Sequence, residues 1–216
     1  MRNFINKLTQ KNEYVLTIIL LLLICIITIV NPSFLTLENG FDILRGSTFV
    51  GICAIGFLFV LITNGFDISF TATATVAQYV MALLLLSDKD IPIFIILLAP
   101  MAIGAILGAL NALLINRLKV PSIIVTIATL NGAIQFATGG DNLYGFPSWF
   151  VSFPRILLIK FTNKDGVQYG LNTVVFIWII LAIVSAIILR RTMLGRKIYA
   201  VGGNLIAANR EGINVN

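Results

Sequence analysis

The chain has 216 residues, of which 58% are hydrophobic and 11% are charged, with a formal net charge of +6. Soluble domains carry about 25% charged residues, and one core could not hide this much apolar surface from water. The composition therefore excludes an ordinary water-soluble protein and predicts an all-α, polytopic helical membrane protein. The basic residues lie at the ends of apolar segments instead of forming one patch, which indicates membrane topology and excludes a nucleic-acid-binding surface.

Six apolar segments follow one another along the chain, and each is long enough, or nearly so, to cross about 30 Å of hydrocarbon as a helix. They cover residues 14–30, 44–63, 68–86, 91–115, 122–138 and 172–189. The first segment follows three basic residues and ends at Asn31-Pro32 without a small-residue cleavage site. It is therefore predicted to be an uncleaved first span and not a signal peptide.

The distribution of lysine and arginine orients these spans, because such residues gather on the cytoplasmic side. With a cytoplasmic N-terminus, the basic sequence at 116–119 and the tail at 190–216 both fall inside. The acidic connection at 31–43 and the long loop at 139–171 fall outside, and the aromatic residues of that loop predict an interfacial helix or lid. Six spans with both termini in the cytoplasm are expected.

A polar break interrupts the apolar residues between the second and third segments, with the sequence Asn64-Gly65-Phe66-Asp67-Ile68-Ser69. Backbone groups in hydrocarbon need partners, so this break fits a discontinuous helix whose middle faces the protein interior or a transport pathway. An intramembrane carboxylate is a candidate functional group, which makes Asp67, with Asn64 and Ser69, a candidate pathway residue. A short turn in which Asp67 caps the next helix is the alternative.

Small residues and polar residues mark the fourth and fifth segments. Gly104 and Gly108, with alanines at 105, 109 and 112, form a small-residue seam that allows close helix packing. Asn111 lies one turn further on and is expected to hydrogen-bond across this seam. On the fifth segment, one helical face carries polar residues that either line a path or bond to neighbouring helices. The pathway candidates on these two segments are Asn111, Thr126, Thr129 and Gln135.

Enzyme chemistry has no recognisable motif in this chain. It contains no histidine, no GxxxxGK[ST] loop, no GxSxG, no HExxH and no paired carboxylates, and both cysteines lie inside apolar segments. No catalytic residue, cofactor or metal site is therefore expected. If ATP drives transport, the ATPase must be another polypeptide.

The tail after the last apolar segment is basic and contains a short helical pattern. Asn204 is placed to cap a helix that starts near Leu205, and Gly212 is placed to end it. The small residues Ala207 and Ala208 between them are suited to close packing in a groove of a partner protein. A juxtamembrane helix on anionic lipid is the alternative.

Three sequence blocks together resemble the permease subunits of ATP-binding-cassette (ABC) importers for simple sugars, of the ribose/xylose/galactose type. The blocks are ITNGFDISFTATATVAQYVMALLLL (62–86), NALLINRLKVPSIIVTIATLNGAIQFATGG (111–140) and LGRKIYAVGGNLIAANREGINVN (194–216). The resemblance covers about residues 44–216, and its third block implies a cytoplasmic coupling segment at 190–216 that docks on the ATPase. The coupling residues implied by the match are Gly195, Tyr199, Gly202, Gly203, Asn204, Ala207, Ala208, Gly212 and Asn214.

The resemblance also implies an assembly and a location. A second permease subunit (identical or different), a cytoplasmic ATP-binding subunit and an extracytoplasmic solute-binding protein are the implied partners, in the bacterial plasma membrane and surrounded by lipid. The implied cargo is a monosaccharide such as ribose, xylose or galactose. The related nucleoside importers, an ion-coupled carrier that uses Asp67 and a non-transporting scaffold are the alternatives.

Two departures from the family pattern and one difference in length accompany this resemblance. Phe70-Thr71-Ala72 stands where the family has Val-Gly-Ser, and Leu205-Ile206 replaces a polar or acidic pair, so this coupling segment is more apolar. Members of the family extend further beyond the third block. The chain is accordingly expected to be the N-terminal two-thirds of one permease domain, as a truncated reading frame, a split subunit or a fragment.

Overall fold

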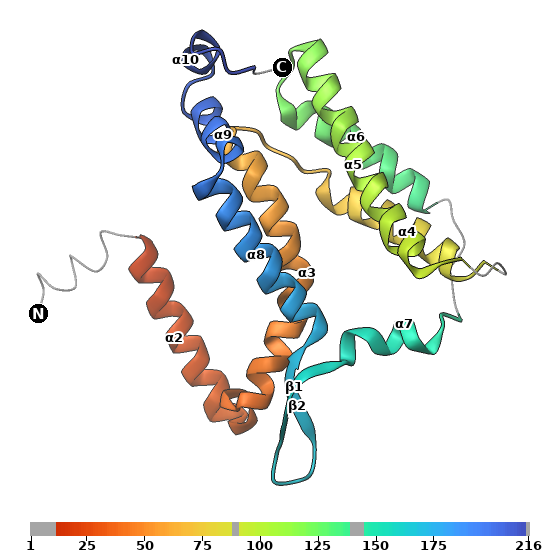
Figure 1. Cartoon of the computed structure of the whole chain (residues 1–216). Coiled ribbons are helices and arrows are strands. Elements are labelled where there is room, and N and C mark those ends of the chain that lie inside the picture. The colour runs from red at the N-terminus through yellow and green to blue at the C-terminus, as the bar shows by residue number, and fades with distance from the viewer. Residues whose placement is uncertain (1–11, 88–90, 139–144, 215–216) are drawn as a thin grey trace, which may run out of the picture. The chain divides into compact units, whose positions relative to one another are not determined.

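The protein is mainly helical in a computed structural model that describes residues 12–87, 91–138 and 145–214 (Figure 1). The helices are α2 (Asn12–Val30), η1 (Pro32–Leu35), α3 (Leu37–Ile62), α4 (Phe70–Leu85), α5 (Ile93–Leu118), α6 (Ser122–Thr138), α7 (Ser148–Ser152), η2 (Phe153–Arg155), α8 (Thr173–Arg191), α9 (Met193–Gly203) and α10 (Leu205–Arg210). Two strands, β1 (Leu157–Thr162) and β2 (Gln168–Asn172), pair in one small sheet. The predicted helical membrane architecture is confirmed.

The long helices coincide with the predicted apolar segments to within a few residues, except that α3 begins earlier, at Leu37. Three of them, α3, α5 and α8, are long and apolar enough to cross a membrane by length and composition. Shorter apolar helices occupy 14–30, 70–85 and 122–132 of the described chain. The six-span topology itself stays a prediction.

Local sequence explains where these helices stop. At the end of α5, Lys119 takes a left-handed conformation with a φ of 52°, and its N–H donates to the Ile115 carbonyl. Pro121 follows and cannot continue a hydrogen-bonded helix, so α6 starts afresh at Ser122. The basic connection predicted at 116–119 is therefore the last turn of α5 and its cap.

Two compact units divide the chain. The first comprises residues 1–47 and 157–171, and the second comprises 48–156 and 172–216. In the first unit, the ring of Phe41 lies 5.9 Å from that of Phe161, which in turn lies 5.7 Å from that of Tyr169. This aromatic cluster joins the start of α3 to the hairpin.

The loop predicted at residues 139–171 contains a hairpin that the sequence did not predict, and the interfacial helix or lid expected there stays a prediction. A short helix, α7, is present there, but residues 157–172 form the two strands. The turn between them is specified locally: the Asn163 Oδ1 accepts hydrogen bonds from the N–H groups of Asp165 (2.9 Å) and Val167 (3.0 Å), and Gly166 has a φ of 78°. The sequence Asn-Lys-Asp-Gly between apolar residues was the missed turn signal.

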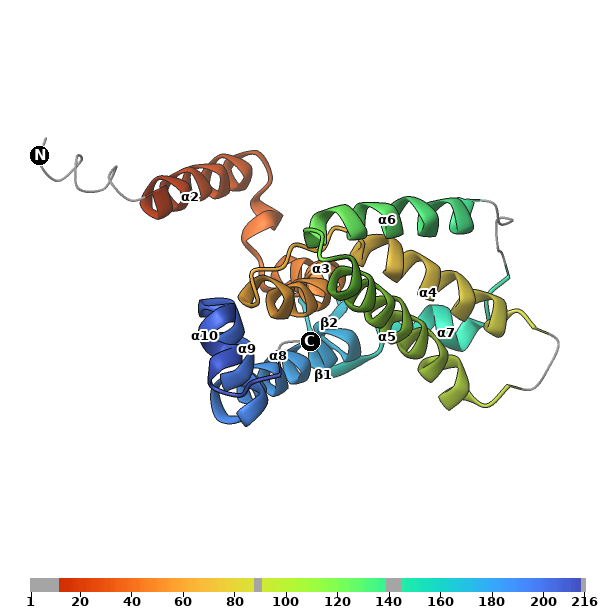
Figure 2. The same ribbon diagram turned by 90° about the horizontal axis from the view of Figure 1, so that it is seen from above.

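In the second unit, α4 packs between α5 and α6 (Figure 2). Ala72 and Val76 of α4 are buried, and Ile103, Leu107 and Leu130 from the two neighbouring helices pack against them. The small-residue seam of α5 is only partly used by this packing: the nearest atom to a Cβ built on Gly104 is the Thr73 Cγ2 at 4.0 Å, and nothing lies within 4 Å of one built on Gly108. The α4–α6 group is what positions the polar break that precedes α4.

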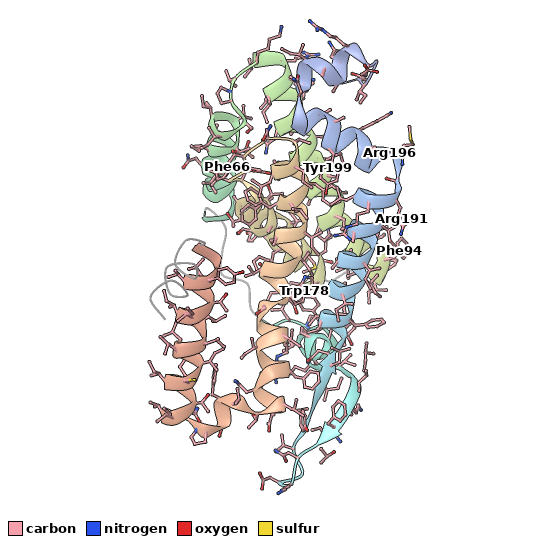
Figure 3. The ribbon with its side chains drawn as sticks, turned by 90° about the vertical axis from the view of Figure 1, so that its left-hand side faces the viewer. Phe66, Phe94, Trp178, Arg191, Arg196 and Tyr199 are labelled. Carbon is pink, nitrogen blue, oxygen red and sulfur yellow. The ribbon has the colours of Figure 1, made fainter. Side chains whose placement is uncertain are left out.

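The α3 and α8 helices of the same unit meet at a glycine. A Cβ at Gly51 would overlap the indole ring of Trp178, which lies on α8 (Figure 3). Gly51→Ala is expected to lower the free energy of unfolding by about 1–3 kcal/mol, because the large ring must leave its position. Gly56→Ala is the matched control, since nothing lies within 4 Å of a Cβ there. Unfolding in mixed detergent micelles would measure both, and equal losses would contradict the prediction.

Candidate functional site

The predicted discontinuity lies between α3 and α4. The α3 helix ends at Ile62, α4 begins at Phe70, and the residues between them are non-helical. The chain leaves α3 through a turn in which Asn64 adopts a left-handed φ of 58°, a conformation that asparagine tolerates better than most residues. The N–H groups of Thr63 and Gly65 both donate to the Val60 carbonyl. We call residues 63–69 the broken segment.

The first turns of α6 satisfy the backbone of the broken segment. The Phe66 N–H donates to the Ser122 Oγ at 2.8 Å, and the Ile68 N–H donates to the Thr126 Oγ1 at 3.3 Å. The Thr126 hydroxyl also lies 3.4 Å from the Phe66 carbonyl and is 2% exposed. Non-helical backbone at membrane depth needs such partners. Ser122 was not predicted as a site residue.

A second set of hydrogen bonds connects the end of the broken segment with α5 and α6. The Asp67 Oδ1 accepts from the N–H and the hydroxyl of Ser69, both at 2.7 Å. The Asn111 Nδ2 donates to the Ser69 Oγ at 2.9 Å, and the Thr129 hydroxyl donates to the Asn111 Oδ1. Ser69 and Asn111 are only 1% and 6% exposed. We call Asp67, Ser69, Asn111 and Thr129 the polar chain.

These contacts show where the pathway candidates lie, and their roles in transport stay predictions. Six pathway candidates lie on the broken segment or bond to it or to its polar chain: Asn64, Asp67, Ser69, Asn111, Thr126 and Thr129. Thr126 and Thr129 bond to neighbouring elements, as the interhelical alternative predicted. Asp67 bonds to the N–H of Ser69, which precedes the first helical residue, so it stabilises the turn before α4 and does not cap the helix. The side chain of Gln135 lies outside the described residues.

The tail forms two helices after α8, and the first of them, α9, was not predicted. Thr192 separates α8 from α9 and accepts a hydrogen bond from the Gly195 N–H at 3.2 Å. Figure 3 shows Arg191, Arg196 and Tyr199 at the end of α8 and along α9. The presence of Gly202 and Gly203 disfavours a helix locally, so tertiary contacts decide its last turn.

The short α10 helix has the predicted caps. The Asn204 Oδ1 accepts from the Ala207 N–H at 3.0 Å. At the other end, Gly212 has a φ of 77° and the Ile213 N–H donates to the Ala208 carbonyl at 3.0 Å. Such a left-handed glycine after the last turn is a frequent helix end. Both cap predictions are confirmed.

The coupling residues fall into two groups by burial. Ala208 is 4% exposed, on a helix that packs against α9, whereas Leu205 and Ile206 are 54% and 67% exposed. Gly195 and Gly202 are close-contact positions: a Cβ would overlap the Leu189 carbonyl at the first and the Ile62 carbonyl at the second. The residues exposed to solvent are Tyr199, Gly203, Asn204, Ala207, Gly212 and Asn214. The small size of Ala208 therefore serves packing inside the tail.

Each unit also has a cavity. The second unit holds an apolar cavity of about 620 Å³ between α3, α4, α5 and α7. Among the residues that line it, Gln78 and Cys53 carry the polar side chains. Phe150 of α7 and Phe146, which precedes α7, also line it. This lining offers only one side-chain amide, that of Gln78, for orienting a polar ligand. A sugar has several hydroxyl groups and would need more hydrogen-bonding partners.

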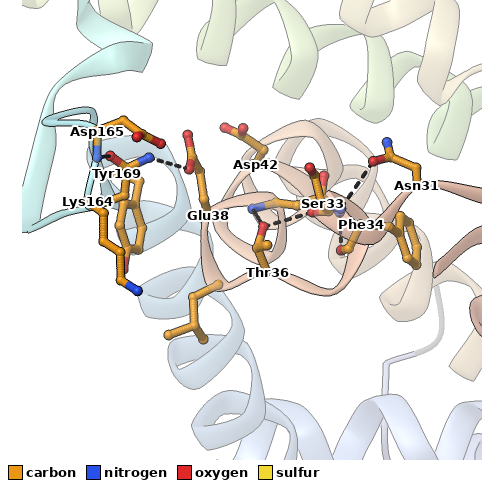
Figure 4. Close-up of a pocket in the computed structure, with 12 residues that line it drawn as sticks. Asn31, Ser33, Phe34, Thr36, Glu38, Asp42, Lys164, Asp165 and Tyr169 are labelled. Carbon is orange, nitrogen blue, oxygen red and sulfur yellow. Dashed lines mark hydrogen bonds between the residues drawn. The ribbon is translucent and has the colours of Figure 1, made fainter. Parts of the chain in front are cut away.

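The first unit holds a more polar cavity of about 770 Å³ between residues 31–42 and the hairpin turn (Figure 4). Its lining includes the carboxylates of Glu38, Asp42 and Asp165, and the Asn163 Nδ2 donates to the Glu38 Oε2 at 3.1 Å. Asp42 is paired with Arg45 at 3.0 Å. Within the part of the chain that the structure describes, no group of three or more such residues is placed to hold a metal ion. The cavity can accept hydrogen bonds from hydroxyl or amino groups.

Apolar helices with a polar break between two of them, followed by a basic helical tail, are typical of a polytopic membrane protein of the permease class. The family model described as "Branched-chain amino acid transport system / permease component" matches residues 39–216. The chain therefore belongs to this permease family. No solved structure matches it significantly.

Curated relatives agree with this membership. The chain is 33% identical to the ribose import permease protein RbsC of Haemophilus influenzae, over 92% of this chain and 60% of the relative. It is 30% identical to the autoinducer 2 import system permease protein LsrC of an Enterobacter species, over 97% and 58% of the two chains. It is 31% identical to the galactose/methyl galactoside import permease protein MglC of Escherichia coli, over 99% and 66%. The chain spans about 60% of the length of the first of these relatives.

Proposed function

We propose that this chain forms part of the transmembrane subunit of an ABC importer in the bacterial plasma membrane. The observation that carries the proposal is the broken segment, whose backbone is satisfied by α6 and whose end joins a buried polar chain. A discontinuous helix of this kind is how transporters place polar groups at membrane depth. Membership of the permease family supports the same class. The chain contributes the pathway and not catalysis, so ATP hydrolysis belongs to a separate subunit.

The tail is the proposed contact with that ATP-binding subunit. On α10, Leu205 and Ile206 expose apolar side chains beside the exposed Ala207. Adjacent exposed apolar side chains on a short helix are suited to insertion into a partner's groove. Asn204 and Gly212 give this helix defined ends, so it can act as one rigid element. Both termini are proposed to be cytoplasmic, in keeping with the basic residues of the tail.

The proposed translocation pathway passes the broken segment. Asp67 and Asn64 keep partly or fully exposed side chains there, whereas Ser69, Asn111 and Thr126 are buried and hold the segment in place. Thr129 supports Asn111, and Gln135 is proposed to continue the same polar face towards the other end of α6. A second permease subunit, identical or different, would complete the pathway within the lipid.

The polar cavity of the first unit is the proposed contact with an extracytoplasmic solute-binding protein. Both of its walls come from segments that the charge distribution places outside, namely residues 31–43 and the loop at 139–171. Its carboxylates favour a partner surface with basic or amide groups. Within the described chain this cavity is the more polar of the two described above.

The proposed cargo is a monosaccharide, since relatives are named for ribose and galactose import. Another relative is named for autoinducer 2 import, and nucleosides are the alternative cargo. An ion-coupled carrier that uses Asp67 is the alternative mechanism.

Uptake measurements test the proposal. In cells that lack their own sugar permeases, we expect uptake of labelled ribose or galactose only when the chain is produced within a full-length permease together with its ATP-binding and solute-binding partners. Labelled nucleosides in the same assay test the alternative cargo. Uptake that survives loss of the ATP-binding subunit, follows a proton or sodium gradient and is abolished by Asp67→Asn would instead establish the carrier mechanism.

A further inference from the structure

The α9 helix bridges the ends of two long helices within the second unit. At its start, Gly195 is buried and packs so closely against the end of α8 that a Cβ would overlap the Ile188 and Leu189 carbonyls. At its other end, Gly202 packs on the last turn of α3, where a Cβ would overlap the Ile62 carbonyl. Figure 1 shows α9 between α8 and the end of α3. The helix is therefore in backbone contact with its neighbours at both ends.

The contact at Gly202 continues directly into the broken segment. The Asn64 Nδ2 donates to the Gly202 carbonyl at 2.6 Å, across 138 residues of sequence. Asn64 reaches it from the left-handed turn that follows Ile62. Two residues beyond Asn64, the Phe66 N–H binds Ser122, and the segment then ends at the polar chain. One end of the tail is thus joined to the polar groups of the break through a few bonded residues.

We propose that Asn64 and Gly202 are positioning residues that transmit movement of the tail to the broken segment. The inference rests on the proposed function in one respect, that the tail receives its movement from an ATP-binding subunit. Gly202 carries no side chain that could change rotamer and absorb a shift of α9, so backbone meets backbone there. The Asn64 side-chain amide stabilises the same contact, because it donates a hydrogen bond to the Gly202 carbonyl.

The geometry also predicts that the two glycines of the Gly202-Gly203 pair differ in their tolerance of a side chain. Nothing lies within 4 Å of a Cβ built on Gly203, which is exposed. Gly202→Ala must push α9 away from α3, whereas Gly203→Ala adds a methyl group to open space. The two variants have the same composition and the same change in helix propensity, so they are a matched pair. Asn64→Gly removes the amide and keeps the left-handed turn accessible.

Hydrogen–deuterium exchange of the purified chain in nanodiscs tests the contact without any partner. In Gly202→Ala and Asn64→Gly, we expect the Phe66 and Ile68 amides to exchange about tenfold faster than in the unmodified chain, because their acceptors on α6 are no longer held in register. Gly203→Ala is expected to leave both rates unchanged. Equal rates in the two glycine variants, or no change in any variant, would overturn the proposed connection.

Transmission is then tested in the assembled transporter by the ratio of sugar molecules imported to ATP molecules hydrolysed. We expect Gly202→Ala to retain association with the ATP-binding subunit and to lower this ratio about fivefold or more, while Gly203→Ala leaves it unchanged. A merely structural role would lower import and hydrolysis together and keep the ratio, which would overturn the inference. If the unmodified tail bound no ATP-binding subunit, the proposed function would fail instead, and the exchange result would still stand on its own.

Discussion

Replacing Ala208 with glutamate is expected to detach α10 from α9. The Ala208 side chain is 4% exposed, and an unpaired carboxylate in its place would cost several kcal/mol if it stayed buried. A helix of six residues with few contacts cannot offset that cost, so it should leave its position. We expect trypsin to cleave at Arg210, in the last turn of α10, about tenfold faster than in the unmodified chain.

The neighbouring Ala207 provides the matched control for this prediction. Its side chain is exposed, so Ala207→Glu should leave cleavage at Arg210 unchanged. Both variants should weaken association with the ATP-binding subunit, one by displacing α10 and the other by placing a charge on its exposed face. Equal cleavage rates for the two variants would show that packing of Ala208 does not hold the helix. Undiminished association of both would count against the docking role of the tail.

Asn111→Leu is expected to lower the free energy of unfolding by about 1–3 kcal/mol, even though leucine is similar in size and suits a membrane helix. The Asn111 amide donates to Ser69 and accepts from Thr129, so its loss removes two hydrogen bonds at the centre of the polar chain. Ser69 is 1% exposed and has no access to water as a substitute partner. Unfolding of the purified chain in detergent micelles at increasing denaturant concentrations would measure this change in the free energy of unfolding.

Asn131 on α6 is the control for Asn111. It is exposed, and its Nδ2 donates to the Ile127 carbonyl of its own helix at 3.0 Å, so Asn131→Leu should not lower stability. A loss at position 111 no larger than that at position 131 would show that the polar chain does not stabilise the break. Loss of transport without loss of stability in Asn111→Leu would instead indicate a direct pathway role.

The identity of the site residues could be predicted from the sequence more fully than their function. Six of the seven pathway candidates meet at the broken segment or in the polar chain, because each is a polar residue in an apolar helix and such residues need partners. Which of these residues are exposed, as Asn64 is, and which are buried, as Ser69 is, was not predictable. A polar side chain fits a transport pathway and an interhelical hydrogen bond equally well. Ser122 escaped prediction because a serine at a helix start is usually explained by the helix alone.

The tail shows the same limit. The caps of α10 follow from local chemistry, since an asparagine before the helix and a glycine after it act on their own backbone neighbours. The α9 helix does not, because its glycine pair opposes helix formation in isolation. The lack of a side chain at Gly202 allows α9 to approach Ile62 closely. This approach is visible only in the folded chain.

The sequence by itself therefore determined the class of protein, the approximate positions of the long helices, the break at residues 64–69 and the ends of α10. Each of these depends on hydrophobicity or on contacts a few residues apart, and both are encoded locally. Only the tertiary structure decided which side chains face inward, that Ala208 is buried while Ile206 is exposed, and that Asn64 meets Gly202. Those outcomes depend on residues far apart in the chain, whose approach is set by the packing of whole helices.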